Sequence, residues 1–351
     1  MTGRKSKVII AMSGGVDSSV AAALLLEAGF DCAGVYMITS QESAESKKNA
    51  VQVAEKLGLT LYVQDFCAEF ESVFDYFCTE YSKGRTPNPC VFCNRYIKFG
   101  KLRDFARQKG ADYLATGHYA RIIKNKEHNS LYKGLSEDKE QSYFLAMVRK
   151  EILSYIILPV GEYSKQDTRR MAEEFGLDCV NKQESQEICF LPKNWVSVLE
   201  QRHPELVHSG NIVDSKGKVL GSHKGVHQFT IGQRRGLGVA KGRPFYVTKI
   251  DAEENTVTLG PKPEVMHRSF LAKDLNWLAD EPADSFRAKV KIRYNSKGSS
   301  ATVYPEQTEG VRVKFDEPVL AVTAGQLAAF YVRDEIGERV IGSGWIEKVI
   351  E

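Results

Sequence analysis

A glycine-rich loop between a short apolar run and a helix-like segment constrains the fold of this chain more than any other feature. The loop covers residues 13–19, SGGVDSS; residues 8–12 before it predict a buried strand, and residues 20–28 after it have helical spacing that stops at Gly29. Glycines let backbone N–H groups turn inward, and a helix N-terminus adds positive potential, so the loop is suited to bind phosphate. No lysine follows the glycines, which excludes the Walker pattern.

Strand and helix patterns then alternate as far as about residue 200. Strands are predicted at 32–37, 59–63 and 113–116, and helices at 45–57, 69–81 and 96–109. Such alternation predicts a parallel sheet covered by helices on both faces, that is, an α/β chain with a Rossmann-like N-terminal domain over residues 1–209. Open sheets of this class bind ligands at the carboxyl ends of their strands.

The pattern changes near residue 210. Short alternating runs follow at 245–250, 256–259, 287–293, 311–315, 327–332 and 340–347, with Gly, Pro or Asn between them. We expect a small central β domain over 210–274 and a C-terminal β-barrel over 275–351. No apolar run approaches about eighteen residues, so no membrane span is expected and a cytoplasmic protein is the default.

Charge and cysteine content leave several kinds of chemistry open. Forty-eight Lys plus Arg against 45 Asp plus Glu give a net charge of +3, which neither requires nor excludes a nucleic-acid partner. Seven cysteines are an odd number, which argues against a structural disulfide framework. Four of them lie beside apolar residues and are expected to be buried small hydrophobes: Cys32, Cys67, Cys78 and Cys179.

Cys90 and Cys93 form a C-x-x-C pair, a spacing typical of redox or metal-binding cysteines. They lie in residues 82–94, a segment so rich in Pro, Gly and Asn that we predict irregular structure throughout. Irregular segments of this length inside a compact domain are more often functional than incidental.

Residues 13–19 resemble the pyrophosphate loop of the ATP-pyrophosphatase family, whose members split ATP between its α- and β-phosphates. Further motifs resemble those of the tRNA-specific 2-thiouridylases, in the family's order: 84–94 with 97–99, 115–121, 141–145, 185–190 and 229–238, and more weakly 292–294 and 325–326. The resemblance reaches across nearly the whole chain. It implies an enzyme that adenylylates the C2 oxygen of wobble uridine 34 of tRNA with ATP and then replaces that oxygen with sulfur.

The resemblance also implies roles for individual residues. Cys189 would carry a persulfide, and Cys93 would be the nucleophile that completes the cycle by forming a disulfide with Cys189. This agrees with the chemistry, since a persulfide delivers sulfane sulfur and a second thiol resolves it. Asp17 would assist catalysis by holding Mg²⁺ on the pyrophosphate. The implied ATP contacts are Ala11, Met12, Ser13, Gly14, Gly15, Val16, Asp17, Ser18, Met37 and Gly117.

Recognition of tRNA requires that the target uridine leave its stack before C2 is accessible. The family's target-base contacts correspond to Asn88, Pro89, Cys90, Lys139, Glu140, Gln141, Arg293 and Tyr294. Gln326 and His118 are further candidate tRNA contacts, and a persulfide-donating protein is the second implied partner. Three positions depart from the family's usual residues: Glu140 replaces Asp, Ala324 replaces Pro and Asn49 replaces Asp.

Three alternatives stay open at this point. Cys90, Cys93 and Cys189 could ligate a [4Fe–4S] cluster whose fourth iron binds sulfide. The loop would also suit an ATP-dependent ligase that forms amides on a small molecule and has no use for the two catalytic cysteines. The third alternative is a catalytically inactive tRNA-binding protein, which would tolerate loss of Asp17 or of the cysteines. Whether the persulfide attacks C2 directly or Cys93 first releases sulfide is likewise open.

Overall fold

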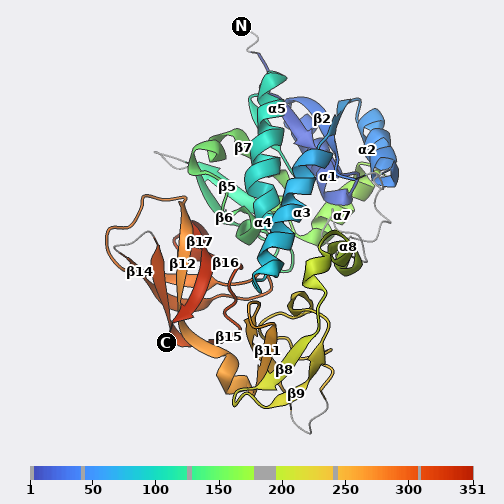
Figure 1. Cartoon of the computed structure of the whole chain (residues 1–351). Coiled ribbons are helices and arrows are strands. Elements are labelled where there is room, and N and C mark those ends of the chain that lie inside the picture. The colour runs from blue at the N-terminus through green and yellow to red at the C-terminus, as the bar shows by residue number, and fades with distance from the viewer. Residues whose placement is uncertain are drawn as a thin grey trace.

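The structure is a computed structural model that describes residues 4–40, 44–124, 129–177, 195–239, 244–306 and 310–350. Cys179, Cys189 and the motif at 185–190 lie outside the described residues. Three bodies are visible in Figure 1: an N-terminal sheet with its helices at the top, a barrel at the lower left and a smaller sheet at the lower right.

The N-terminal sheet is parallel, as predicted, with strand order β3-β2-β1-β4-β7. Its strands are β1 (Lys7–Ala11), β2 (Asp31–Ile38), β3 (Thr60–Asp65), β4 (Tyr113–Ala115) and β7 (Ile156–Ile157). The chain runs outward from β1 to β2 and β3, then returns to place β4 on the other side of β1. Loops after β1 and β4 therefore flank the switch point, where open α/β sheets bind ligands.

Helices cover both faces of this sheet because β1 is apolar on both sides. Val8 and Ile10 pack with α1 (Val16–Glu27), α2 (Ala44–Lys56) and α7 (Lys165–Glu174). Ile9 lies on the opposite face. It belongs to the cluster that includes residues of α3 (Cys67–Ser82) and α5 (Leu102–Gln108).

The prediction that residues 82–94 are irregular throughout was wrong. Helix α4 spans Pro89–Cys93 and continues through a π-helical segment, η1 (Asn94–Lys101), into α5. Proline is favourable in the first turn, where its missing N–H leaves no hydrogen bond unmade. Asn88 caps the helix, since its side chain accepts from the Val91 N–H at 3.4 Å. Asn88 and Pro89, which suggested irregular structure in the sequence, therefore mark the beginning of a helix.

The C-terminal barrel is confirmed, and it is closed. Its antiparallel strands follow the order β12-β15-β14-β13-β16-β17, and β12 also pairs with β17. They are β12 (Met266–Trp277), β13 (Phe286–Lys291), β14 (Ser299–Pro305), β15 (Val311–Leu320), β16 (Leu327–Arg333) and β17 (Glu338–Ile350). Because β12 crosses residue 275, where the sequence placed the junction, we put the start of the barrel at Met266.

A hairpin of the N-terminal domain extends the barrel sheet. Its strands are β5 (Ala120–Lys124) and β6 (Asn129–Lys133), and β6 pairs with β17 at Tyr132 and Arg339. Apolar side chains of the barrel, such as Leu327 and Tyr331, share one core cluster with Ile9 of the N-terminal sheet. The two bodies are therefore joined both by backbone pairing and by a common core.

The central body is a four-stranded sheet with order β10-β11-β8-β9, in which only β8 and β11 are parallel. Its strands are β8 (Gly210–Asp214), β9 (Val219–His223), β10 (Tyr246–Asp251) and β11 (Thr256–Gly260). The remaining helices of the described residues are α6 (Ser142–Leu145), η2 (Lys150–Tyr155), η3 (Pro159–Glu162), α8 (Trp195–Arg202), η5 (Pro204–Leu206), η6 (Val226–Gln228) and η7 (Lys262–Val265). None of the helices in the described ranges is long and apolar enough to cross a membrane.

Candidate active site

The glycine-rich loop lies at the carboxyl end of β1 and opens α1. Gly14 has a φ of 74°, and a Cβ there would lie 2.6 Å from the Ser46 carbonyl oxygen and 2.9 Å from the Ala50 nitrogen, so α2 requires glycine at this position. The Ser13 N–H donates to Ser18 Oγ at 3.2 Å, which closes the loop over the first turn of α1. Gly15 is the N-cap, and no side chain caps the helix there. The loop thus presents backbone N–H groups at a helix N-terminus, as an anion requires.

The end of β4 packs directly against this loop. A Cβ on Gly117 would lie 2.7 Å from the Asp17 carbonyl carbon and 2.8 Å from the Ser18 nitrogen. Met37 lies half-buried near the end of β2, the other neighbour of β1. The ATP contacts implied by the resemblance, residues 11–18, Met37 and Gly117, therefore gather at the carboxyl ends of three adjacent strands.

Two residues that sequence reasoning missed surround Asp17. Its Oδ1 accepts from the Tyr119 hydroxyl and forms an ion pair with Lys165 Nζ, each at 2.6 Å. Lys165 is the first residue of α7 and lies 148 positions along the chain from Asp17. No motif marks it. The capping pattern Ser164-x-x-Asp167 could have located the helix start, but not its approach to α1.

Cys93 is the last residue of α4 and only 3% exposed, within the core cluster that contains Val91 and Ile97. Cys90 is half-buried three residues earlier, so the two thiols stand on one side of the helix. The next residue, Asn94, donates from Nδ2 to the Phe144 carbonyl at 3.1 Å. The partner thiol Cys189 lies outside the described residues. Within the described ranges, no group of three or more His, Cys, Asp or Glu side chains is arranged to hold a metal ion.

His118 is buried beside Thr116, whose Oγ1 lies 2.7 Å from His118 Nδ1. Burial, reinforced by the positive charge of Lys98, holds the pKa of His118 well below its usual range. The imidazole is therefore neutral at neutral pH. The tRNA contact assigned to His118 stays a prediction.

The segment that follows β6 brings three predicted tRNA contacts together. Gln141 pairs with Tyr119 twice: its N–H donates to the Tyr119 carbonyl at 2.8 Å, and its Oε1 accepts from the Tyr119 N–H at 3.0 Å. Glu140 is buried and forms an ion pair with Lys291 of the barrel at 3.3 Å. Burial lowers the pKa of Lys291. Lys139 precedes them and is half-buried.

Barrel residues complete this region. Tyr294 stacks on Phe144 with ring centroids 4.4 Å apart, and the Lys291 ammonium lies 5.8 Å from the Tyr294 ring. Arg293 is exposed beside them. The structure therefore places Glu140 and Tyr294, which are 154 positions apart, next to the same buried lysine.

Gln326 is held against the loop that precedes α4. Its Nε2 donates to the carbonyls of Thr86 at 3.1 Å and Pro87 at 3.0 Å. The Thr86 N–H donates to the Ala324 carbonyl at 2.9 Å. Because the acceptor is a backbone carbonyl, this hydrogen bond does not depend on the residue type at position 324. Gln326 is expected to contact tRNA. Its amide group also binds the loop that runs from Arg85 to Asn88 and Pro89.

Arg85 strengthens the same junction by reaching three groups. It pairs with Glu80 of α3 at 2.8 Å and with Glu347 of β17 at 3.0 Å, and it donates to the Ile346 carbonyl at 3.4 Å. Asn88 donates to the Tyr143 hydroxyl at 3.4 Å, and that hydroxyl donates to the Leu327 carbonyl at 2.9 Å. The barrel therefore supports the helix that carries Cys90 and Cys93.

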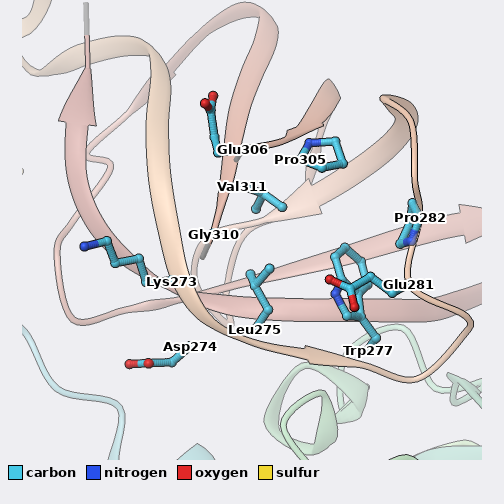
Figure 2. A pocket seen from close by; sticks show the side chains of 10 residues that line it. All are labelled: Lys273, Asp274, Leu275, Trp277, Glu281, Pro282, Pro305, Glu306, Gly310 and Val311. Atoms are coloured by element: carbon cyan, nitrogen blue, oxygen red, sulfur yellow. The ribbon is translucent and has the colours of Figure 1, made fainter. Parts of the chain in front are cut away.

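A pocket of about 480 Å³ lies elsewhere, on the side of the barrel (Figure 2). Its lining includes the charged residues Lys273, Asp274, Glu281 and Glu306 and the apolar residues Leu275, Trp277 and Val311. None of its described lining residues belongs to the predicted nucleotide or tRNA contacts.

The central body carries local positive charge. Arg234 and Arg235, which lie in the motif 229–238, are both exposed.

Comparison with known proteins covers nearly the whole chain. A family model described as tRNA methyl transferase HUP domain matches residues 6–193, a tRNA methyl transferase PRC-barrel domain matches 197–261, and an aminomethyltransferase beta-barrel domain matches 267–346. A protein of Acetivibrio thermocellus named tRNA-specific 2-thiouridylase MnmA is 44% identical, over 98% of this chain and 99% of its own. Proteins of the same name from Carboxydothermus hydrogenoformans (44% identical; 99% of this chain, 98% of the relative) and Clostridium acetobutylicum (42%; 97% and 99%) agree.

Proposed function

The chain belongs to the family of tRNA-specific 2-thiouridylases, and from this premise we propose that it converts wobble uridine 34 of tRNA to 2-thiouridine at the expense of ATP. The observation that carries the proposal within the molecule is a chain of contacts through Tyr119. Its hydroxyl donates to Asp17 in the glycine-rich loop, and its backbone pairs with Gln141. Phe144, three residues further on, accepts from Asn94 beside Cys93. These contacts link the glycine-rich loop to the helix that carries Cys93, which supports a single site that includes both.

In the first half-reaction the loop binds the phosphates of ATP. The C2 oxygen of uridine attacks the α-phosphorus, the bond to the bridging oxygen breaks, pyrophosphate leaves with the electron pair, and the N3 proton is released. Asp17 fits a Mg²⁺ ion because its carboxylate is one-third exposed at the loop, and hard cations choose carboxylate and phosphate oxygens. The ion would screen charge on the leaving pyrophosphate.

In the second half-reaction the terminal sulfur of a Cys189 persulfide attacks C2. The bond from C2 to the adenylylated oxygen breaks and AMP leaves with the electron pair. The Cys93 thiolate then attacks the Cys189 sulfur, which breaks the sulfur–sulfur bond, frees 2-thiouridine and forms a Cys93–Cys189 disulfide. An external thiol returns both cysteines to the reduced form, and a persulfide-donating protein reloads Cys189. Prior release of sulfide by Cys93 leads to the same products.

Contacts to the target uridine come from the cluster at the junction of the N-terminal domain and the barrel. We assign Asn88, Pro89 and Cys90, then Lys139, Glu140 and Gln141, then Arg293 and Tyr294, with His118 and Gln326 as further tRNA contacts. Tyr294 has the ring needed to stack on an unstacked base, and Arg293 is exposed for phosphate or base edges.

Nucleoside mass spectrometry of tRNA incubated with enzyme, ATP and a sulfur donor tests this function. We expect Cys93→Ser to abolish 2-thiouridine and to keep tRNA-stimulated pyrophosphate release. Cys32→Ser is the matched control, because burial raises the pKa of the Cys32 thiol to about 11 and keeps it protonated. Undiminished 2-thiouridine from Cys93→Ser would refute the role of Cys93.

Parallel measurements of pyrophosphate release and of tRNA binding separate the alternatives. Pyrophosphate release stimulated by a small amine but not by tRNA would favour a ligase. Intact tRNA binding without any product would favour an inactive binding protein. Cys90 and Cys93 stand on one side of α4, so a cluster with Cys189 is a second candidate mechanism. Anaerobically purified protein without iron, acid-labile sulfide or a brown chromophore would refute it.

A further inference from the structure

A cation from a distant helix reaches the glycine-rich loop. Lys165 Nζ lies 2.6 Å from Asp17 Oδ1, and its side chain is only 11% exposed. Asp17 is in the first turn of α1, the end of the helix that presents N–H groups to an anion. A positive charge therefore stands at the point where the phosphates of a nucleotide would enter.

The chemistry of the loop calls for such a charge. The loop itself supplies backbone N–H groups and serine hydroxyls but no cation, since no lysine follows Gly14 and Gly15 as it does in the Walker pattern. Asp17 adds a carboxylate, which would repel the several negative charges of ATP. The Lys165 ammonium neutralises that carboxylate before the nucleotide binds and offers a cation when it arrives.

The backbone of Lys165 is held firmly, so its side chain is the part that can change partner. Ser164 and Asp167 form a complete capping box: Ser164 Oγ accepts from the Asp167 N–H at 3.1 Å, and Asp167 Oδ2 accepts from the Ser164 N–H at 3.2 Å. Ala172 of α7 is buried in one core with Val20 of α1. Helices α1 and α7 are thereby packed against each other.

Tyr119 keeps the ammonium near the loop. Its hydroxyl donates to Asp17 Oδ1 at 2.6 Å, and its ring centroid lies 5.8 Å from Lys165 Nζ, within the range of a cation–π contact. Three groups from three separate parts of the chain thus converge beside the phosphate loop.

We propose that Lys165 binds the β- and γ-phosphates of ATP and stays on the pyrophosphate as it leaves, with Asp17 and Tyr119 holding the ammonium ready beforehand. Lys165 takes the role of the lysine that this loop lacks. The inference rests on the proposed function for the identity of the nucleotide, and it adds a residue from α7 to the reacting groups.

Binding measurements without tRNA test the proposal. Calorimetric titrations of the full chain with ATP, inorganic pyrophosphate and adenosine compare wild type with Lys165→Met, Lys165→Arg and Arg170→Met. Arg170 is the matched control: it is a cation on the same helix, but its side chain is 67% exposed. We expect Lys165→Met to weaken ATP and pyrophosphate at least about tenfold, the strength of one charged hydrogen bond, and to leave adenosine unchanged. Lys165→Arg should regain most of the affinity, and Arg170→Met should lose none.

Equal weakening of ATP and adenosine by Lys165→Met would show that Lys165 only braces α1 against α7 and would overturn the proposal, as would unchanged affinity for pyrophosphate. If the Met variant does not fold, Lys165→Gln, which keeps a donor for Asp17, replaces it under the same criteria. Failure of the proposed function is distinguishable, because ATP binding that depends on Lys165 can coexist with absence of 2-thiouridine.

Discussion

Gly117→Ala is the sharpest test of how the nucleotide pocket is built. The added methyl group would lie 2.7 Å from the Asp17 carbonyl carbon, 2.8 Å from the Ser18 nitrogen and 3.0 Å from the Asp17 oxygen. Ordinary contacts of this kind begin at 3.4 Å, so the end of β4 or the first turn of α1 must move by several tenths of an ångström. All three atoms are backbone, so no side chain can turn away to relieve the contact.

The expected cost follows from that geometry. Overpacking of a close contact costs about 1–3 kcal/mol. Loss of glycine's freedom in the unfolded chain returns about 0.4–1 kcal/mol. The net loss of unfolding free energy should be about 1–2 kcal/mol. Because the loop is displaced, it should also bind ATP at least about tenfold more weakly, which corresponds to a loss of about 1.4 kcal/mol of binding free energy.

Urea unfolding and ATP titration of Gly117→Ala measure both effects, with Gly221→Ala as the control. A Cβ on Gly221 meets only Val239 Cγ2, at an ordinary 3.6 Å, so this variant should unfold and bind ATP as the wild type does. If Gly117→Ala matched Gly221→Ala in stability and ATP affinity, the packing of β4 on the loop would not shape the pocket, and the reasoning would be refuted.

Three further predictions concern the surroundings of the pocket. Burial lowers the pKa of His118, so the unfolded chain takes up this proton before the folded chain does as the pH falls. The free energy of unfolding should therefore decline below about pH 6.5, the ordinary histidine pKa. The urea midpoints measured at about pH 7.5 and 5.5 should differ less in His118→Gln than in the wild type. Asn88→Ala removes the cap of α4 and a buried hydrogen bond, and should lower the free energy of unfolding by about 1–2 kcal/mol in the same assay. Arg85→Met breaks the junction of α3 with β17 and should slow 2-thiouridine formation more than it weakens tRNA binding, measured by single-turnover kinetics and filter binding.

Each of these has a result that would count against it. His223 is also buried with a lowered pKa, so an identical acid response in the wild type and His118→Gln would assign the effect to other groups such as His223. An unchanged midpoint in Asn88→Ala would mean that α4 needs no cap. A loss of tRNA affinity equal to the loss of rate in Arg85→Met would make Arg85 part of the tRNA surface rather than a support for α4.

Local patterns predicted the N-terminal sheet well because its strands are apolar runs and its helices end at glycines. Gly14 and Gly15 predicted the loop correctly, because their role depends on residues that are their neighbours in sequence. Pro89 was misread, because proline breaks a helix from inside but favours its first turn, and sequence alone did not show which position it occupied. β12 was missed because alternation fails there: Ser269 is buried, and Asp274 has a φ of 48° that bends the strand.

The site is less predictable than the fold wherever it depends on contacts between distant segments. Lys165 resembles any surface lysine at a helix start, and only the packing of α7 on α1 brings it to Asp17. Gln326 shows a related limit: its motif was recognised, but its two hydrogen bonds to the loop before α4 exist only because the barrel folds against that loop.

The continuation of the barrel sheet into the β5–β6 hairpin has a practical consequence for dividing the protein. A fragment that ended before Met266 would leave the edge of β6 without its neighbour and would uncover the ring of Tyr143, which is fully buried in the complete chain. Bare strand edges and exposed aromatic faces recruit other molecules of the same kind. The fragment 1–265 should therefore aggregate when expressed alone, and supplying the barrel as a separate polypeptide should rescue it.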